Sequence, residues 1–223
     1  MTFNNHRHSA IHDNNDGTVM TKTLTLHDDP ISGNGYKVRL LLAFLGIDYD
    51  YVRYDILKAE TRTKAFLKRL NPNGRIPVLE LEDGTPLAES NAILCYLADG
   101  TAWWPSNRLH RARTLQWMFF EQYSHEPNVA TLRFWTHLPA LTPAQEAARD
   151  GKFTQGCAAL SLINTHLAQN PWFVGEMPTI ADIALYAYTH VAHEGGFDMA
   201  PYAAIATWLK RIEALPGYVG MTS

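Results

Sequence analysis

Residues 74–93 read GRIPVLELEDGTPLAESNAI and carry the strongest structural signals in the chain. Asp83-Gly84 separates two short apolar runs, a pattern that strongly favours a β-hairpin. Glu89-Ser90 then opens an amphipathic helix that extends to about Asp99, and serine is a preferred residue at the N-cap of a helix. The stretch therefore predicts two short paired strands followed directly by a helix.

The residues before this stretch predict a strand–helix–strand unit. Residues 23–27 alternate apolar and polar side chains as a strand does, and a polar loop occupies 28–35. Apolar side chains at helical spacing fill 36–46, ending at a glycine suited to a C-terminal cap. Residues 49–54 read as a second strand and 63–70 as a short helix. The predicted order over this part is βαβαββα, with a right-handed βαβ crossover.

Beyond Trp103-Trp104-Pro105 every long segment has helical periodicity. Helices are predicted over 108–135, with a bend near Pro127, and over 143–169, 179–193 and 202–214. Thr179 and Asp182 have the spacing of a capping box and are expected to serve folding more than chemistry. We predict a disordered polar tail over 1–21, an α/β domain over 22–101 and an all-helical domain over 107–223.

Composition excludes several classes of protein. The 223 residues are 46% hydrophobic and 18% charged, with a formal charge of −3 and a pI near 6.3, which argues against nucleic-acid and anionic-membrane partners. No apolar run approaches the length that spans a membrane. Cys95 and Cys157 lie far apart and form no CxxC pair, so a reducing, cytoplasmic location is expected.

Histidine patterns do not predict a metal site. His6, His8 and His12 could bind an ion in principle, but a polar tail supplies no fixed geometry. His190, His193 and Glu194 form HxxHE, which is neither of the orders used by zinc proteases. We therefore expect no metal.

Several motifs in the right order resemble one known family. The segments 74–79, 83–84 and 89–93, with Tyr96-Leu97, look like the glutathione-binding half of cytosolic glutathione transferases of the bacterial type. Residues 172–175 and 178–184 resemble a helix start in the second half of that family. The likeness spans Thr23 to Tyr218, and it implies a thioredoxin-like N-terminal domain, an all-α C-terminal helical bundle and a homodimer.

The loop after the first strand reads Ser32-Gly33-Asn34-Gly35, where redox proteins of thioredoxin-like fold often carry CxxC. The resemblance implies that glutathione, as co-substrate, supplies the sulfur while the protein stabilises its thiolate. Ser32 is then the first candidate for the catalytic hydrogen-bond donor, and Asn34 the second. The residues alone also allow a plain loop and helix cap.

The resemblance also implies the residues that bind glutathione. Ile76 is expected to bind the cysteinyl part through its backbone, next to a cis bond with Pro77, although the local sequence by itself favours the commoner trans form. Glu89 and Ser90 are expected to hold the γ-glutamyl amine and carboxylate, and Arg75 to reach the glycyl carboxylate.

The second substrate is expected between the domains, where small apolar ligands commonly bind. Aromatic residues crowd 117–135, and Tyr123 and Trp135 are the predicted lining of this electrophile pocket. The predicted function is a detoxifying glutathione transferase that directs the thiolate at small hydrophobic electrophiles. Two alternatives stay open: glutathione-dependent reduction of disulfides or peroxides, and a non-catalytic binding protein.

Overall fold

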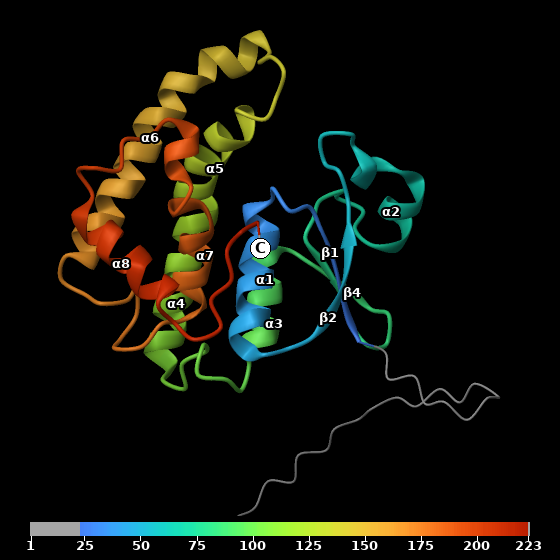
Figure 1. The fold of residues 1–223 in the computed structure, drawn as a ribbon, viewed down its shortest axis with the longest axis horizontal. Coiled ribbons are helices and arrows are strands. Elements are labelled where there is room, and N and C mark those ends of the chain that lie inside the picture. Colours follow the sequence, from blue (N-terminus) through green and yellow to red (C-terminus); the bar gives the residue numbers. More distant parts are fainter. Residues whose placement is uncertain (1–22, 223) are drawn as a thin grey trace, which may run out of the picture.

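The computed structural model describes residues 23–222 (Figure 1). The predicted tail over 1–21, with His6, His8 and His12, lies outside these described residues. The expected order of an α/β part followed by helices is confirmed. The elements are β1 (Leu24–Asp28), α1 (Gly33–Leu45), β2 (Tyr49–Arg53), α2 (Lys64–Arg69), β3 (Val78–Glu80), β4 (Pro86–Ala88), α3 (Ser90–Ala98), α4 (Arg108–Phe120), α5 (Glu126–Trp135), α6 (Pro143–Leu167), α7 (Ile180–Thr189) and α8 (Ala203–Glu213).

The four strands form one sheet in the order β2-β1-β3-β4. β1 pairs in parallel with β2 and antiparallel with β3, and β3 and β4 form the predicted hairpin. Helices α1 and α3 lie on the face of the sheet that is turned toward the helical part, while α2 lies on the other side (Figure 1). The N-termini of α1 and α3 are therefore positioned beside the helical part.

Helix α1 begins three residues earlier than the periodicity predicted. The Ser32 side chain accepts a hydrogen bond from the Gly35 N–H, so the loop residues 33–35 form the first turn of the helix. Gly46 closes the helix in a left-handed conformation, as expected. A 3₁₀ turn over Glu60–Arg62 precedes α2 and was not predicted.

The long helix predicted over 108–135 is interrupted close to Pro127, where a bend was expected. Residues 121–125 form a π-helical turn between α4 and α5, and Pro127 lies in the first turn of α5. Because proline has no N–H to donate to the preceding turn, the regular hydrogen-bond ladder cannot continue through it. The turn places Glu121 and His125 inside the protein, with no exposed surface.

One continuous apolar core joins the sheet to the helical part. It includes Leu26 of the sheet, Leu41 of α1 and Trp208 of α8, all fully buried. The predicted capping box of α7 is confirmed, with the Asp182 carboxylate accepting from the Thr179 N–H. The limits 22–101 and 107–223 given above stay predictions. No helix within residues 23–222 is long and apolar enough to cross a membrane.

Candidate functional site

A cavity of about 560 Å³ lies between the sheet and the helical part. One wall is formed by the start of α1, from Ile31 to Asn34, and by the segment Gly74–Ile76. The opposite wall comes from α5 and from Tyr188 of α7. Ser32, Asn34, Arg75 and Ile76, four of the predicted site residues, therefore line the same space.

The N-terminus of α1 opens into this cavity. Ser32 caps the helix through its side-chain oxygen and is almost fully buried. The Asn34 N–H donates to the Tyr188 hydroxyl at 3.1 Å, so a residue of the helical part completes the first turn. A helix N-terminus favours an anion through its N–H groups and its dipole.

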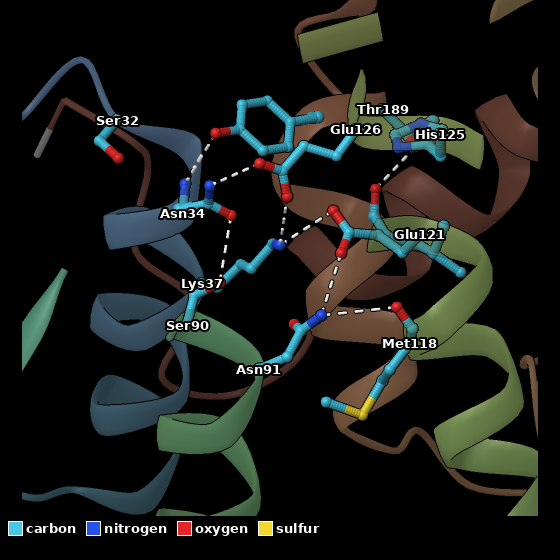
Figure 2. Close-up of polar contacts among 12 residues, drawn as sticks. Ser32, Asn34, Lys37, Ser90, Asn91, Met118, Glu121, His125, Glu126 and Thr189 are labelled. Atoms are coloured by element: carbon cyan, nitrogen blue, oxygen red, sulfur yellow. Dashed lines mark hydrogen bonds and ion pairs between the residues drawn. The ribbon is translucent and has the colours of Figure 1, made fainter. Parts of the chain in front are cut away.

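The Asn34 side chain is held from both sides (Figure 2). Its Nδ2 donates to Glu126 Oε1 at 2.8 Å, and its Oδ1 accepts from Ser90 Oγ at 3.1 Å. One Nδ2 hydrogen is left to donate elsewhere, because an amide nitrogen carries two. The network joins the starts of α1, α3 and α5 in one rigid arrangement.

A buried ion pair lies behind Asn34 (Figure 2). Lys37 Nζ is 2.9 Å from Glu121 Oε1 and 3.5 Å from Glu126 Oε2. Burial raises the pKa of Glu121, an effect that the Lys37 charge opposes. Asn91 Nδ2 donates to the other Glu121 oxygen at 3.2 Å. Lys37 therefore fixes Glu126, which in turn fixes Asn34.

The segments 75–77 and 89–90 meet in a small polar side pocket that shares Asn34 and Glu126 with the main cavity. The Ile76–Pro77 bond is cis, as predicted. Ser90 is not the N-cap of α3: Glu89 holds that position at φ 71°, and Ser90 is the first helical residue. The Ser90 hydroxyl therefore donates to Asn34 and does not cap its own helix.

Tyr123 and Trp135, the predicted lining of the electrophile pocket, do not line this cavity. Tyr123 is 87% exposed, and Trp135 lines a different hollow together with Leu141 and Arg149. The face of α5 that meets the cavity instead includes Ala130, Thr131 and Phe134. An aromatic-rich helix does not by itself reveal which of its faces meets a ligand.

Sequence reasoning also missed polar residues of the site, namely Lys37, Glu121, Glu126, Arg133 and Tyr188. One signal was present, since Lys37 and Glu121 stand within apolar and aromatic runs, where a charged side chain needs a buried partner. Arg133 donates to the Ile31 carbonyl at 2.8 Å and to Glu194 at 2.6 Å, and these bonds tie α5 to the loop before Ser32.

Tyr36 is fully buried and donates its hydroxyl to the Val219 carbonyl, away from the cavity. Within residues 23–222 no group of three or more His, Cys, Asp or Glu side chains is arranged to hold a metal ion.

Comparison with known proteins extends these observations. Residues 22–99 match the glutathione S-transferase N-terminal domain, and residues 124–216 match the C-terminal domain. The chain is 32% identical to the disulfide-bond oxidoreductase YfcG of Escherichia coli over 82% of this chain and 87% of that protein.

Solved structures agree with these matches. A glutathione S-transferase from Pseudomonas fluorescens is 48% identical with a TM-score of 0.86, covering 90% of this chain and all of the other. A glutathione transferase from Phanerochaete chrysosporium, solved with oxidized glutathione, is 27% identical with a TM-score of 0.76 and covers 88% and 91% of the two chains. With both domains matched in order and the thioredoxin-like sheet followed by a helical domain, this chain belongs to the glutathione S-transferase family.

Proposed function

We propose that the chain binds glutathione in the interdomain cavity and uses its thiolate as a nucleophile. The observation that carries this proposal is the convergence of the α1 start, the segment 75–77 and the α3 start on Asn34. Glutathione has two carboxylates, an amine and a thiol, so it needs complementary groups spread over such a surface.

The proposed orientation follows the charges and backbone groups of the two pockets. Ile76 offers its backbone to the cysteinyl part, and exposed Arg75 meets the glycyl carboxylate. The γ-glutamyl group enters the side pocket, where the α3 N-terminus attracts its carboxylate. Glu89, which is exposed at this pocket, attracts its amine. The Ser90 hydroxyl is already engaged with Asn34, so its backbone N–H is the better ligand.

This orientation points the glutathione sulfur at the N-terminus of α1, next to Ser32 and Asn34. A free thiol has a pKa of about 8.5, and hydrogen bonds to the sulfur and the helix dipole lower it. In the transferase reaction, the thiolate forms a bond to an electrophilic carbon while the leaving group departs with its electron pair. The apolar part of the wall, with Ala130 and Phe134, is where a hydrophobic electrophile would rest.

Glutathione-dependent disulfide reduction is the second candidate. In that reaction the thiolate attacks one sulfur of a disulfide, and the other sulfur leaves as a thiolate. The cavity wall favours a polar substrate because Arg62, Gln122 and Arg133 line it beside the apolar groups. Similarity to a disulfide-bond oxidoreductase and to a transferase solved with oxidized glutathione also supports disulfide reduction.

A homodimer in the cytoplasm completes the proposal. Tyr96 of α3 is 52% exposed, Phe119 of α4 is 69% exposed, and Tyr123 follows one turn later at 87%. Aromatic residues are enriched at protein interfaces, so we place the dimer contact on these exposed side chains. This role accounts for Tyr123 better than the electrophile pocket does.

Calorimetric titration with glutathione tests the binding step. Arg75→Ala should weaken glutathione binding about ten- to a hundredfold, since a charge-assisted hydrogen bond contributes about 1.5–3 kcal/mol. Arg69→Ala is the matched control, because Arg69 lies on α2 and pairs with Glu80 outside the cavity. Equal losses in both variants, or no binding by the wild type, would refute the proposed site.

Turnover assays then separate the candidates. Conjugation of a chlorinated nitroarene would establish the transferase, and reduction of a glutathione mixed disulfide or an organic hydroperoxide would establish the reductase. Glutathione binding without turnover of any of these substrates would instead favour the non-catalytic binding protein.

A further inference from the structure

Tyr188 is the only α7 side chain among the residues that line the interdomain cavity. It is 8% exposed, and its ring packs directly on the backbone of Gly33 at the start of α1. Its hydroxyl oxygen accepts the Asn34 N–H at 3.1 Å. A side chain of the helical domain thus reaches the position proposed above for the glutathione sulfur.

The phenolic hydrogen of Tyr188 has no acceptor among residues 23–222. A tyrosine hydroxyl both donates and accepts, and the hydrogen bond from Asn34 uses only its accepting capacity. Tyr186, two residues earlier on the same helix, differs because its hydroxyl meets Glu213 and Tyr218. Since Tyr188 lines the cavity, its free donor is available to a ligand there.

We propose that Tyr188 is a catalytic residue whose hydroxyl donates a hydrogen bond to the sulfur of bound glutathione, an inference that rests on the proposed function. The phenol stays neutral, so it stabilises the thiolate without exchanging a proton with it. Burial raises the pKa of Tyr188 well above its ordinary value, in keeping with a permanent donor. Ser32 would approach the same sulfur from the other side of the α1 N-terminus.

The arrangement makes the site depend on both domains. The helix start supplies Ser32 and Asn34 from the thioredoxin-like domain, while Tyr188 comes from the helical domain and also supports the first turn of α1 through Asn34. The same Tyr188 hydroxyl would donate to the sulfur and accepts the hydrogen bond from Asn34, so the test must separate these two roles.

The first test compares Tyr188→Phe with Tyr186→Phe. The thiol pKa of bound glutathione is followed through the ultraviolet absorbance of its thiolate, alongside calorimetric affinity and the pH profile of turnover. Loss of a hydrogen bond to a charged acceptor should raise that pKa by about one to two units in Tyr188→Phe. The affinity for glutathione should change only a few fold, and Tyr186→Phe should leave the pKa unchanged.

A second variant separates donation from structural support. Site-specific replacement of Tyr188 by 3-fluorotyrosine makes the phenol a stronger donor and a weaker acceptor while keeping its shape. If Tyr188 donates to the sulfur, the thiol pKa of bound glutathione should be lower in the fluorinated protein. If Tyr188 only accepts the hydrogen bond from the Asn34 N–H, that pKa should not decrease. This variant also tests the proposal if Tyr188→Phe does not fold.

The outcomes distinguish the two levels of the proposal. Wild-type protein that binds no glutathione overturns the proposed function and this inference with it. Glutathione binding with the same thiol pKa in wild type, Tyr188→Phe and the fluorinated protein overturns the role of Tyr188 alone.

Discussion

The Tyr188 ring lies against the backbone of Gly33 so closely that a Cβ built at Gly33 would overlap it. Gly33 does not have a positive φ, so the conformation of the backbone does not require glycine here. The requirement arises from packing between the two domains. The first turn of α1 can meet α7 only when residue 33 has no side chain.

Gly33→Ala should therefore disturb the site. The new methyl group would push the Tyr188 ring away from Asn34 and widen the gap between the α1 start and α7. We expect at least a tenfold loss of glutathione affinity, measured by calorimetry. Gly151→Ala is the control, because Gly151 lies inside α6 with nothing near its Cβ position, and it should stabilise the protein by about 0.5–1 kcal/mol. Undiminished binding by Gly33→Ala would contradict the packing argument.

Sequence reasoning reached most of the fold because the elements carry local signals. The hairpin at Asp83-Gly84 and the capping box at Thr179 depend on a few neighbouring residues, and both are confirmed. The start of α1 was missed because glycines at 33 and 35 are poor helix formers, and there only the Ser32 cap and contacts with α7 favour the helix.

The site was harder to predict because it depends on which face of each helix is turned toward the cavity. The π-helical turn at 121–125 changes the rotation per residue, so the 3.6-residue period does not carry from α4 into α5. Tyr123 lies within that turn and is exposed, whereas Glu126 and Phe134, which follow it, line the cavity. Tyr188 belongs to an apolar helix, and the neighbouring sequence gives no sign that it lines the cavity. Its place in the site follows only from the packing of the two domains.

Asp182 is expected to serve stability and not catalysis. Its carboxylate accepts hydrogen bonds from the backbone of Thr179 and Phe173 and from the Trp208 indole, all buried. Asp182→Ala leaves these donors without a partner, and each unsatisfied donor costs about 1–3 kcal/mol, so we expect a loss of at least about 3 kcal/mol in urea unfolding. Thr179→Ala should cost less, about 0.5–2 kcal/mol. Protein of either variant that remains folded should bind glutathione normally; a selective loss of binding would contradict a structural role.

His125 should make stability sensitive to acid. Burial and the nearby Lys37 charge lower the pKa of His125 from 6.5 to about 3. Between these values the unfolded chain takes up a proton that the native protein does not, so stability falls as pH decreases from 6.5 toward 3, by at most about 1.4 kcal/mol per pH unit.

His125→Gln, which can keep a hydrogen bond to Thr189, should remove this contribution. The difference in unfolding free energy between the two proteins is the quantity to measure, because buried carboxyls such as Asp28, whose pKa is raised to about 7 by burial, act in the opposite direction. Exposed His193→Gln is the control. Parallel pH curves for His125→Gln and the wild type would contradict the expectation.

The exposed aromatic residues should mediate dimer formation. Phe119→Glu combined with Tyr123→Glu introduces charges that would have to be buried in the proposed interface, so the protein should sediment as a monomer at micromolar concentration while the wild type sediments as a dimer. Met177→Glu, at a residue 67% exposed on a loop, should leave the dimer intact. A monomeric wild type would rule out the interface.

Ser32 and Asn34 should differ in how they affect the thiolate. At pH 7 an unassisted thiol is only a few per cent ionised, so a lowered pKa increases the reactive fraction by up to tens of fold. The Ser32 oxygen accepts from the Gly35 N–H, which leaves its hydroxyl hydrogen to donate to the sulfur. Ser32→Ala should therefore raise the pH midpoint of turnover by about one to two units and leave glutathione affinity within a few fold.

Asn34→Ala should act differently, because it breaks the contacts with Glu126 and Ser90 that join three helix starts. We expect it to weaken glutathione binding, through displacement of Ser90 and Glu126, as well as turnover. Asn91→Ala is a useful comparison, since it removes an amide that contacts Glu121 behind the site and lies outside both pockets. If Ser32→Ala keeps the wild-type rate and pH profile while Asn34→Ala loses both, the remaining Nδ2 hydrogen of Asn34 is the donor to the sulfur, and the assignment to Ser32 is wrong.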